Sequence, residues 1–92
     1  MASSEQQIDN GALRVTKWTI DPNDEIPRHI HEFEYVVVPL VNGVMHVLNS
    51  DGSEIAAEIR IGQSYAREAG AEHTVINRGS EVIAFVEIEK LR

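Results

Sequence analysis

The stretch Pro27-Arg28-His29-Ile30-His31 decides the fold together with a distant counterpart, Gly70-Ala71-Glu72-His73-Thr74-Val75-Ile76-Asn77. The two stretches contain three of the four histidines in this chain of 92 residues. Side chains two positions apart in a β-strand point to the same side, so His29 and His31 can direct both imidazoles at one point. A third imidazole from a neighbouring strand would complete a facial set of ligands for a divalent metal ion. Such a set leaves coordination positions open for a small molecule.

The rest of the sequence is typical of short β-strands separated by turns. Asp21-Pro22-Asn23-Asp24 and Asn49-Ser50-Asp51-Gly52 are turn sequences, and Asn42-Gly43 predicts a tight hairpin. The segment 55–61 favours a strand but has a weak helical alternative. About eight short strands without a convincing helix predict an all-β sandwich or barrel. The expected strands are 13–20, 29–31, 33–41, 44–48, 55–61, 63–67, 73–77 and 82–89.

The last expected strand shows an alternating pattern with one buried side. The alternation predicts that the apolar row is buried and that Glu87 and Glu89 lie on the opposite side. The apolar row consists of Val82, Ala84, Val86 and Ile88. In the segment 13–20, both rows mix polar and apolar residues, so its buried side stays open.

Composition limits the partners and the setting. The formal net charge of −7, from 8 basic and 15 acidic residues, argues against nucleic acid and anionic membranes as partners. The chain has no cysteine, and its polar start lacks the pattern of a signal peptide, so we expect a cytoplasmic protein. The longest apolar run, 35–41, is too short to span a bilayer.

The length allows one small domain with a thin core, which barrel closure or a partner subunit would support. We expect residues 1–10 to form an N-terminal extension or an edge strand and residues 11–92 to form the domain. Strand edges that a second subunit could cover favour a homodimer.

The two histidine stretches resemble the two motifs of the cupin superfamily, which consists of small double-stranded β-helix, or jelly-roll, barrels. In the first motif, His29, His31 and the terminal Gly43 match, and Asn23 stands at the first glycine. In the second motif four residues match, and Glu68 replaces the usual proline. The matching residues are Gly62, Gly70, His73 and Asn77. The likeness covers nearly the whole chain, from about Val15 to Glu89, and is nearest to a subgroup of small bacterial cupins, some named for β-alanine degradation.

The resemblance implies an all-β single cupin barrel with a divalent metal ion held by His29, His31 and His73. Val36 occupies the position of the motif glutamate, and Glu34, two residues earlier, is the candidate fourth ligand. Zn, Fe, Ni, Mn and Cu all suit such a site. We expect Val36, Val38 and Val75 to wall the pocket.

Three alternatives follow for the function. The first is a metal-dependent enzyme acting on an unidentified small molecule, of the dioxygenase, isomerase or decarboxylase type, with Tyr35 and Glu34 as candidate catalytic groups. The second is a non-catalytic module that binds a metal or a small ligand. A third possibility is a barrel whose metal site is vestigial. The remaining histidine, His46, has no motif partner and is expected on the surface, while Asn77 is expected to support a turn.

Overall fold

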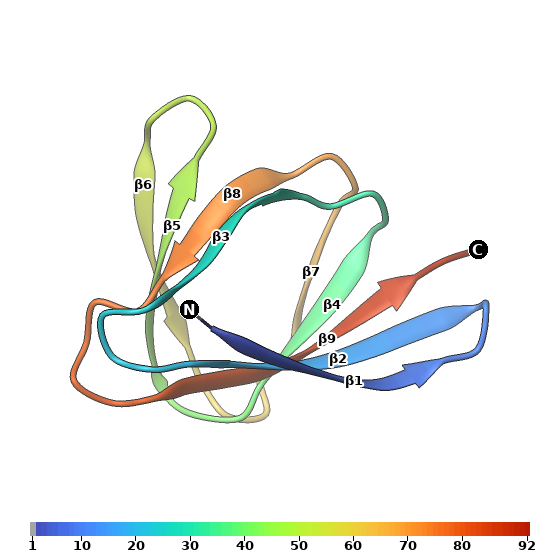
Figure 1. Cartoon of the computed structure of the whole chain (residues 1–92), viewed down its shortest axis with the longest axis horizontal. Coiled ribbons are helices and arrows are strands. Elements are labelled where there is room, and N and C mark those ends of the chain that lie inside the picture. Colours follow the sequence, from blue (N-terminus) through green and yellow to red (C-terminus); the bar gives the residue numbers. More distant parts are fainter. Residues whose placement is uncertain (1) are drawn as a thin grey trace.

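The computed structural model describes residues 2–92, which form nine β-strands and no helix (Figure 1). The expectation of an all-β chain is therefore confirmed, and the segment with a helical alternative is a strand. The strands are β1 (Ser3–Asp9), β2 (Leu13–Ile20), β3 (Glu25–Ile30), β4 (Tyr35–Pro39), β5 (Gly43–Asn49), β6 (Glu54–Ile59), β7 (Tyr65–Arg67), β8 (Glu72–Ile76) and β9 (Ile83–Lys90). Residues 2–92 contain no helix of the length and apolar character that crossing a membrane requires.

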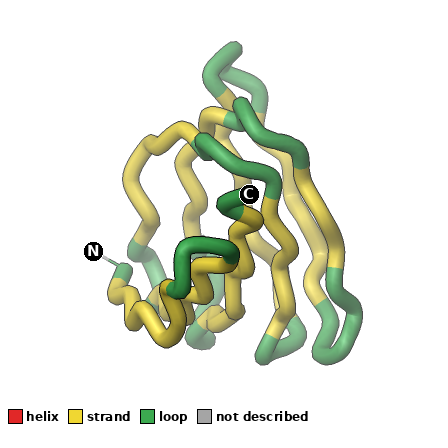
Figure 2. The backbone as a smooth tube through the Cα atoms, turned by 90° about the vertical axis from the view of Figure 1, so that its right-hand side faces the viewer, coloured by secondary structure: helices red, strands yellow, loops and turns green. Residues whose placement is uncertain are grey.

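The strands form two antiparallel sheets that face each other as the walls of a barrel (Figure 2). The five-stranded sheet has the order β1-β2-β9-β4-β7, and the four-stranded sheet has the order β3-β8-β5-β6. Strand β1 lies at the edge of the larger sheet, and within residues 2–92 its pairing partner is β2. The chain passes repeatedly from one sheet to the other, which brings segments that are distant in sequence into one interior.

The prediction of a hairpin at Asn42-Gly43 is wrong. Strand β4 pairs with β7 and β9 in the larger sheet, whereas β5 pairs with β6 and β8 in the smaller one. The segment between them crosses the barrel end: Leu40 N donates to Ala84 O, and Ile61 N donates to Asn42 Oδ1 at 2.8 Å. The turn-forming dipeptide therefore lies where the chain passes from one sheet to the other, and not in a hairpin within one sheet.

The core lies between the sheets and is apolar. It comprises Ile20, Ile26, Tyr35, Val37, Met45, Ile59, Val75, Ile83 and Phe85. This composition corrects the expected side of β9, because Ile83 and Phe85 face the interior and Val82 is 44% exposed. Glu87 follows Phe85 on the same inward row, two positions further along the strand. Both rows of β9 begin with apolar residues, so the hydrophobic pattern did not identify the inner one.

Asn77 holds the closed end of the barrel and is only 1% exposed. Its Nδ2 atom donates to Ile20 O at 2.9 Å and to Glu81 O at 2.8 Å, and Gly79 N donates to its Oδ1 at 3.0 Å. The side chain therefore ties the end of β2 to the turn between β8 and β9, as the expected turn role requires.

Candidate metal centre

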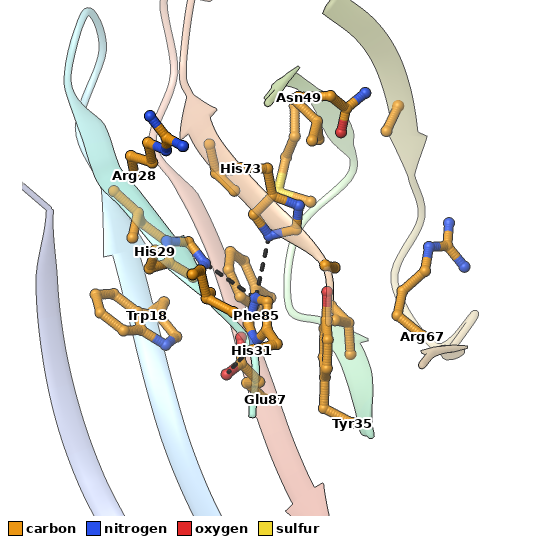
Figure 3. Close-up of a pocket in the computed structure, with 18 of the residues that line it drawn as sticks. Trp18, Arg28, His29, His31, Tyr35, Asn49, Arg67, His73, Phe85 and Glu87 are labelled. Atoms are coloured by element: carbon orange, nitrogen blue, oxygen red, sulfur yellow. Dashed lines mark hydrogen bonds and ion pairs between the residues drawn. The ribbon is translucent and has the colours of Figure 1, made fainter. Parts of the chain in front are cut away.

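Three histidines converge inside the barrel from two paired strands. His29 of β3 is the register partner of His73 of β8. His31 follows β3 directly and is fixed by two backbone hydrogen bonds, His31 N to Ala71 O at 2.9 Å and Gly70 N to His31 O at 2.8 Å. The Nε2 atom of His31 lies 2.9 Å from that of His29 and 3.1 Å from that of His73 (Figure 3). Within residues 2–92, these three are the one group of potential ligands that lies within 4.8 Å.

The ring nitrogens of this cluster are better arranged to bind a cation than to form hydrogen bonds with one another. His29 Nδ1 lies 2.8 Å from Pro27 O, so its hydrogen is donated there and its Nε2 carries a lone pair. The Nε2 atom of His31 faces two such nitrogens, and one proton can bridge only one of the two contacts. Two nitrogens bound at right angles to one ion at ~2.1 Å lie about 3.0 Å apart. The two spacings at His31, 2.9 and 3.1 Å, match that arrangement.

The electrostatics keep two of these rings neutral. Burial, reinforced by His29 and then His73, lowers the pKa of His31 to about 4. Burial, followed by His29 and Arg67, also lowers the pKa of His73 to about 4. A neutral imidazole is the form that binds a metal, so both rings are ready to act as ligands at neutral pH.

Tyr35, one of the two candidate catalytic residues, lies in the cavity. Its ring stacks on His31 with centroids 4.0 Å apart and an interplanar angle of 21°. Burial, followed by the charge of Glu87, raises the Tyr35 pKa to about 12. The phenol therefore stays protonated at neutral pH and is a hydrogen-bond donor.

Glu34, the other candidate, is not brought to the histidines. Its side chain is 59% exposed and lies 3.4 Å from Lys90 Nζ, outside the barrel wall. The inward positions of β4 are Tyr35 and Val37, so Glu34 and Val36 share the outward row. The expected pocket wall is accordingly wrong for Val36 and Val38, whereas Val75 does line the cavity.

Two carboxylates that the sequence pattern placed outside are found inside instead. Glu87 Oε1 lies 3.9 Å from His31 Nδ1, and its side chain is 12% exposed. Burial, and then the charge of Glu89, raises the Glu87 pKa to about 7. Glu89 is paired with Arg14 through two hydrogen bonds, from Nε at 2.9 Å and from Nη2 at 3.0 Å. The shared parity of Glu87 with Ile83 and Phe85 was the signal in the sequence.

The cavity around the histidines has a volume of about 580 Å³, within the usual range for small-molecule sites. Much of its wall is apolar, and polar side chains also line it, among them Arg28, Asn49, Arg67, Glu87 and Glu89. Arg67 contributes to the wall, with its guanidinium carbon 4.6 Å from the Tyr65 ring centroid. The apolar wall includes Trp18, Ile26, Val37, Met45, Val47, Val75 and Phe85. His46 lies outside this group, with Nδ1 3.4 Å from Glu54 Oε2, in agreement with its expected place.

Comparison with known proteins gives one close curated relative and many related structures. The chain is 42% identical over 83 residues to the β-alanine degradation protein BauB of Pseudomonas aeruginosa, covering 90% of this chain and 86% of that protein. The crystal structure of a cupin domain from Bordetella pertussis is 38% identical, with a TM-score of 0.93 over 97% of this chain and 92% of that one.

A double-stranded β-helix protein of the RmlC-like cupin family from Methanocaldococcus jannaschii shares the fold at 11% identity. Its TM-score is 0.79, over 98% of this chain and 80% of that one. No family model matches the sequence.

Proposed function

The chain belongs to the cupin superfamily, and from this premise we propose that it binds a divalent metal ion through His29, His31 and His73 and holds a small molecule beside it. The observation that carries the proposal is the convergence of three Nε2 atoms, with contacts of 2.9 and 3.1 Å. When bound, the ion would supply a Lewis acid with open coordination positions.

The cavity supports a ligand of metabolite size. Its volume of about 580 Å³ exceeds what the ion alone needs. The apolar wall would exclude water from the bound molecule, while Tyr35 and Arg67 offer hydrogen-bond donors. Because the relative at 42% identity is named for β-alanine degradation, β-alanine is the first molecule to test.

Catalysis is favoured over simple binding by two groups that share the cavity with the histidines. Tyr35 can donate a proton or a hydrogen bond to a bound substrate. Glu87 can accept a proton, since its pKa of about 7 leaves it partly ionised at neutral pH. These residues would move and hold protons beside a metal-bound substrate, in a reaction of the dioxygenase, isomerase or decarboxylase type.

Zinc titration calorimetry on chelator-treated protein tests the metal proposal, with metal content by mass spectrometry after reloading with Zn, Fe, Ni, Mn or Cu. We expect one ion per chain in the wild type and none in His31→Ala or His73→Ala. His46→Ala is the matched control, because that histidine lies outside the cluster, and it should bind normally. Full occupancy of both ligand variants would overturn the proposal.

The non-catalytic alternative makes a different prediction. A binding module would hold β-alanine or a related metabolite and form no product from it. Tyr35→Phe would then weaken binding of that metabolite and have no other effect. Mass spectrometry of a candidate metabolite after incubation with the zinc- or iron-loaded protein separates the two functions. Product that disappears in His73→Ala would establish catalysis.

A further inference from the structure

Among residues 2–92, Glu87 makes one ion-pair contact, with the Nδ1 atom of His31 at 3.9 Å. Within the described chain, no side chain donates a hydrogen bond to the Glu87 carboxylate. Glu89, two residues further on, accepts two hydrogen bonds from Arg14. A carboxylate in a largely apolar cavity is costly unless something pairs with it. A hydrogen on Nδ1 of His31, donated to this carboxylate, would offset part of that cost.

We propose that Glu87 is a positioning residue for the metal ligand His31, receiving the Nδ1 hydrogen of that ring once Nε2 holds the ion. This inference rests on the proposed metal site. A neutral imidazole carries one ring hydrogen, so a ring that coordinates through Nε2 must carry it on Nδ1. On His31, Nδ1 is the atom that faces Glu87 (Figure 3).

The other contacts of His31 leave this edge of the ring for Glu87 to fix. Tyr35 stacks on the ring face and restrains its plane, but stacking does not select which nitrogen is protonated. His29 shows the complete form of the arrangement, because its Nδ1 donates to Pro27 O at 2.8 Å. The 3.9 Å contact is about 1 Å longer than a charge-assisted hydrogen bond. A small rotation of Glu87 closes that gap when the ion fixes the hydrogen.

The test measures zinc affinity and the His31 ring hydrogen in Glu87→Gln. Loss of the charge should weaken zinc binding about 10- to 100-fold, the usual effect of removing such a partner. The Hδ1 resonance of His31 in the zinc-loaded protein should move upfield and exchange faster with water. Glu34→Gln is the matched control, since that carboxylate lies outside the barrel, and it should change neither readout.

Two results separate this inference from the proposed function. If Glu87→Gln binds zinc as tightly as the wild type and keeps its Hδ1 resonance while His31→Ala binds none, the positioning role is refuted and the metal site stands. If His31→Ala itself binds zinc normally, the metal site fails and the positioning role fails with it. Circular dichroism of Glu87→Gln verifies that the variant is folded.

Discussion

Replacing Glu87 with Gln should stabilise the metal-free protein, and the gain should grow with pH. The folded pKa of Glu87 is about 7, and its ordinary value is 4.5. Below pH 4.5 the residue is protonated in both states, so its charge contributes nothing to the difference. As pH rises toward and above 7, the unfolded chain carries the charge freely while the folded chain carries it at a cost. Stability associated with Glu87 is therefore lost over that window.

The size of the effect follows from the two pKa values. They differ by about 2.5, and one pKa unit corresponds to about 1.36 kcal/mol, which gives about 3 kcal/mol as an upper limit. Since 12% of the side chain reaches solvent, we expect about 2 kcal/mol. Urea unfolding of chelator-treated wild type and Glu87→Gln at pH 5 and pH 8.5 measures it. Equal stabilities at pH 8.5, or a larger gain at pH 5, would refute the assignment of Glu87 to a buried, unpaired site.

Three further outcomes can be measured with standard assays. Asn77→Ala removes three hydrogen bonds, one buried and two part-buried, and should cost about 3 kcal/mol, or roughly 12–24 °C in Tm by calorimetry. Zinc at 100 times its Kd should add about 2.7 kcal/mol, which scanning fluorimetry would record as a rise of roughly 11–22 °C, and no rise would contradict the metal site. Glu34→Gln should leave zinc affinity by calorimetry within about threefold of wild type, because water and salt screen an exposed charge.

The histidine cluster could be predicted from the sequence because two simple constraints act on it. Alternation along the extended segment 29–31 places His29 and His31 on one side, and His73 of β8 is the register partner of His29. Neither constraint depends on knowing which side of the strand is buried. The three histidines converge whichever side of the sheet faces the interior, provided that the two strands are neighbours.

The carboxylate beside the histidines, Glu87, could not be found in this way, because its position depends on which side of each strand faces the interior. Val36 and Val37 are both apolar, as are Ala84 and Phe85, so hydrophobicity does not distinguish the inner row from the outer one. The pattern placed Glu87 on the wrong side of β9, although its parity with Ile83 was correct. The composition of these strands explains the failure: because the outward residues of β4 and β9 are also largely apolar, no polar row marks the exterior.

The inward row of β9 also shows how one strand organises the barrel interior. Ile83 and Phe85, at 2% and 3% exposure, belong to the buried apolar core. Further along the strand, Glu87 lies beside His31, and Glu89 follows it on the same row. The inward row of the neighbouring strand β2 has the same order: Ile20 pairs with Ile83 in the core, and Arg14 pairs with Glu89 and neutralises its charge.

The apolar core lets the chain fold, and it also lowers the local dielectric constant around the polar groups next to it. That low dielectric makes the Glu87 charge costly when no cation is bound and would make it effective beside a bound cation. The same residue should therefore weaken the metal-free fold and strengthen the metal site, a combination that a purely structural carboxylate would not produce.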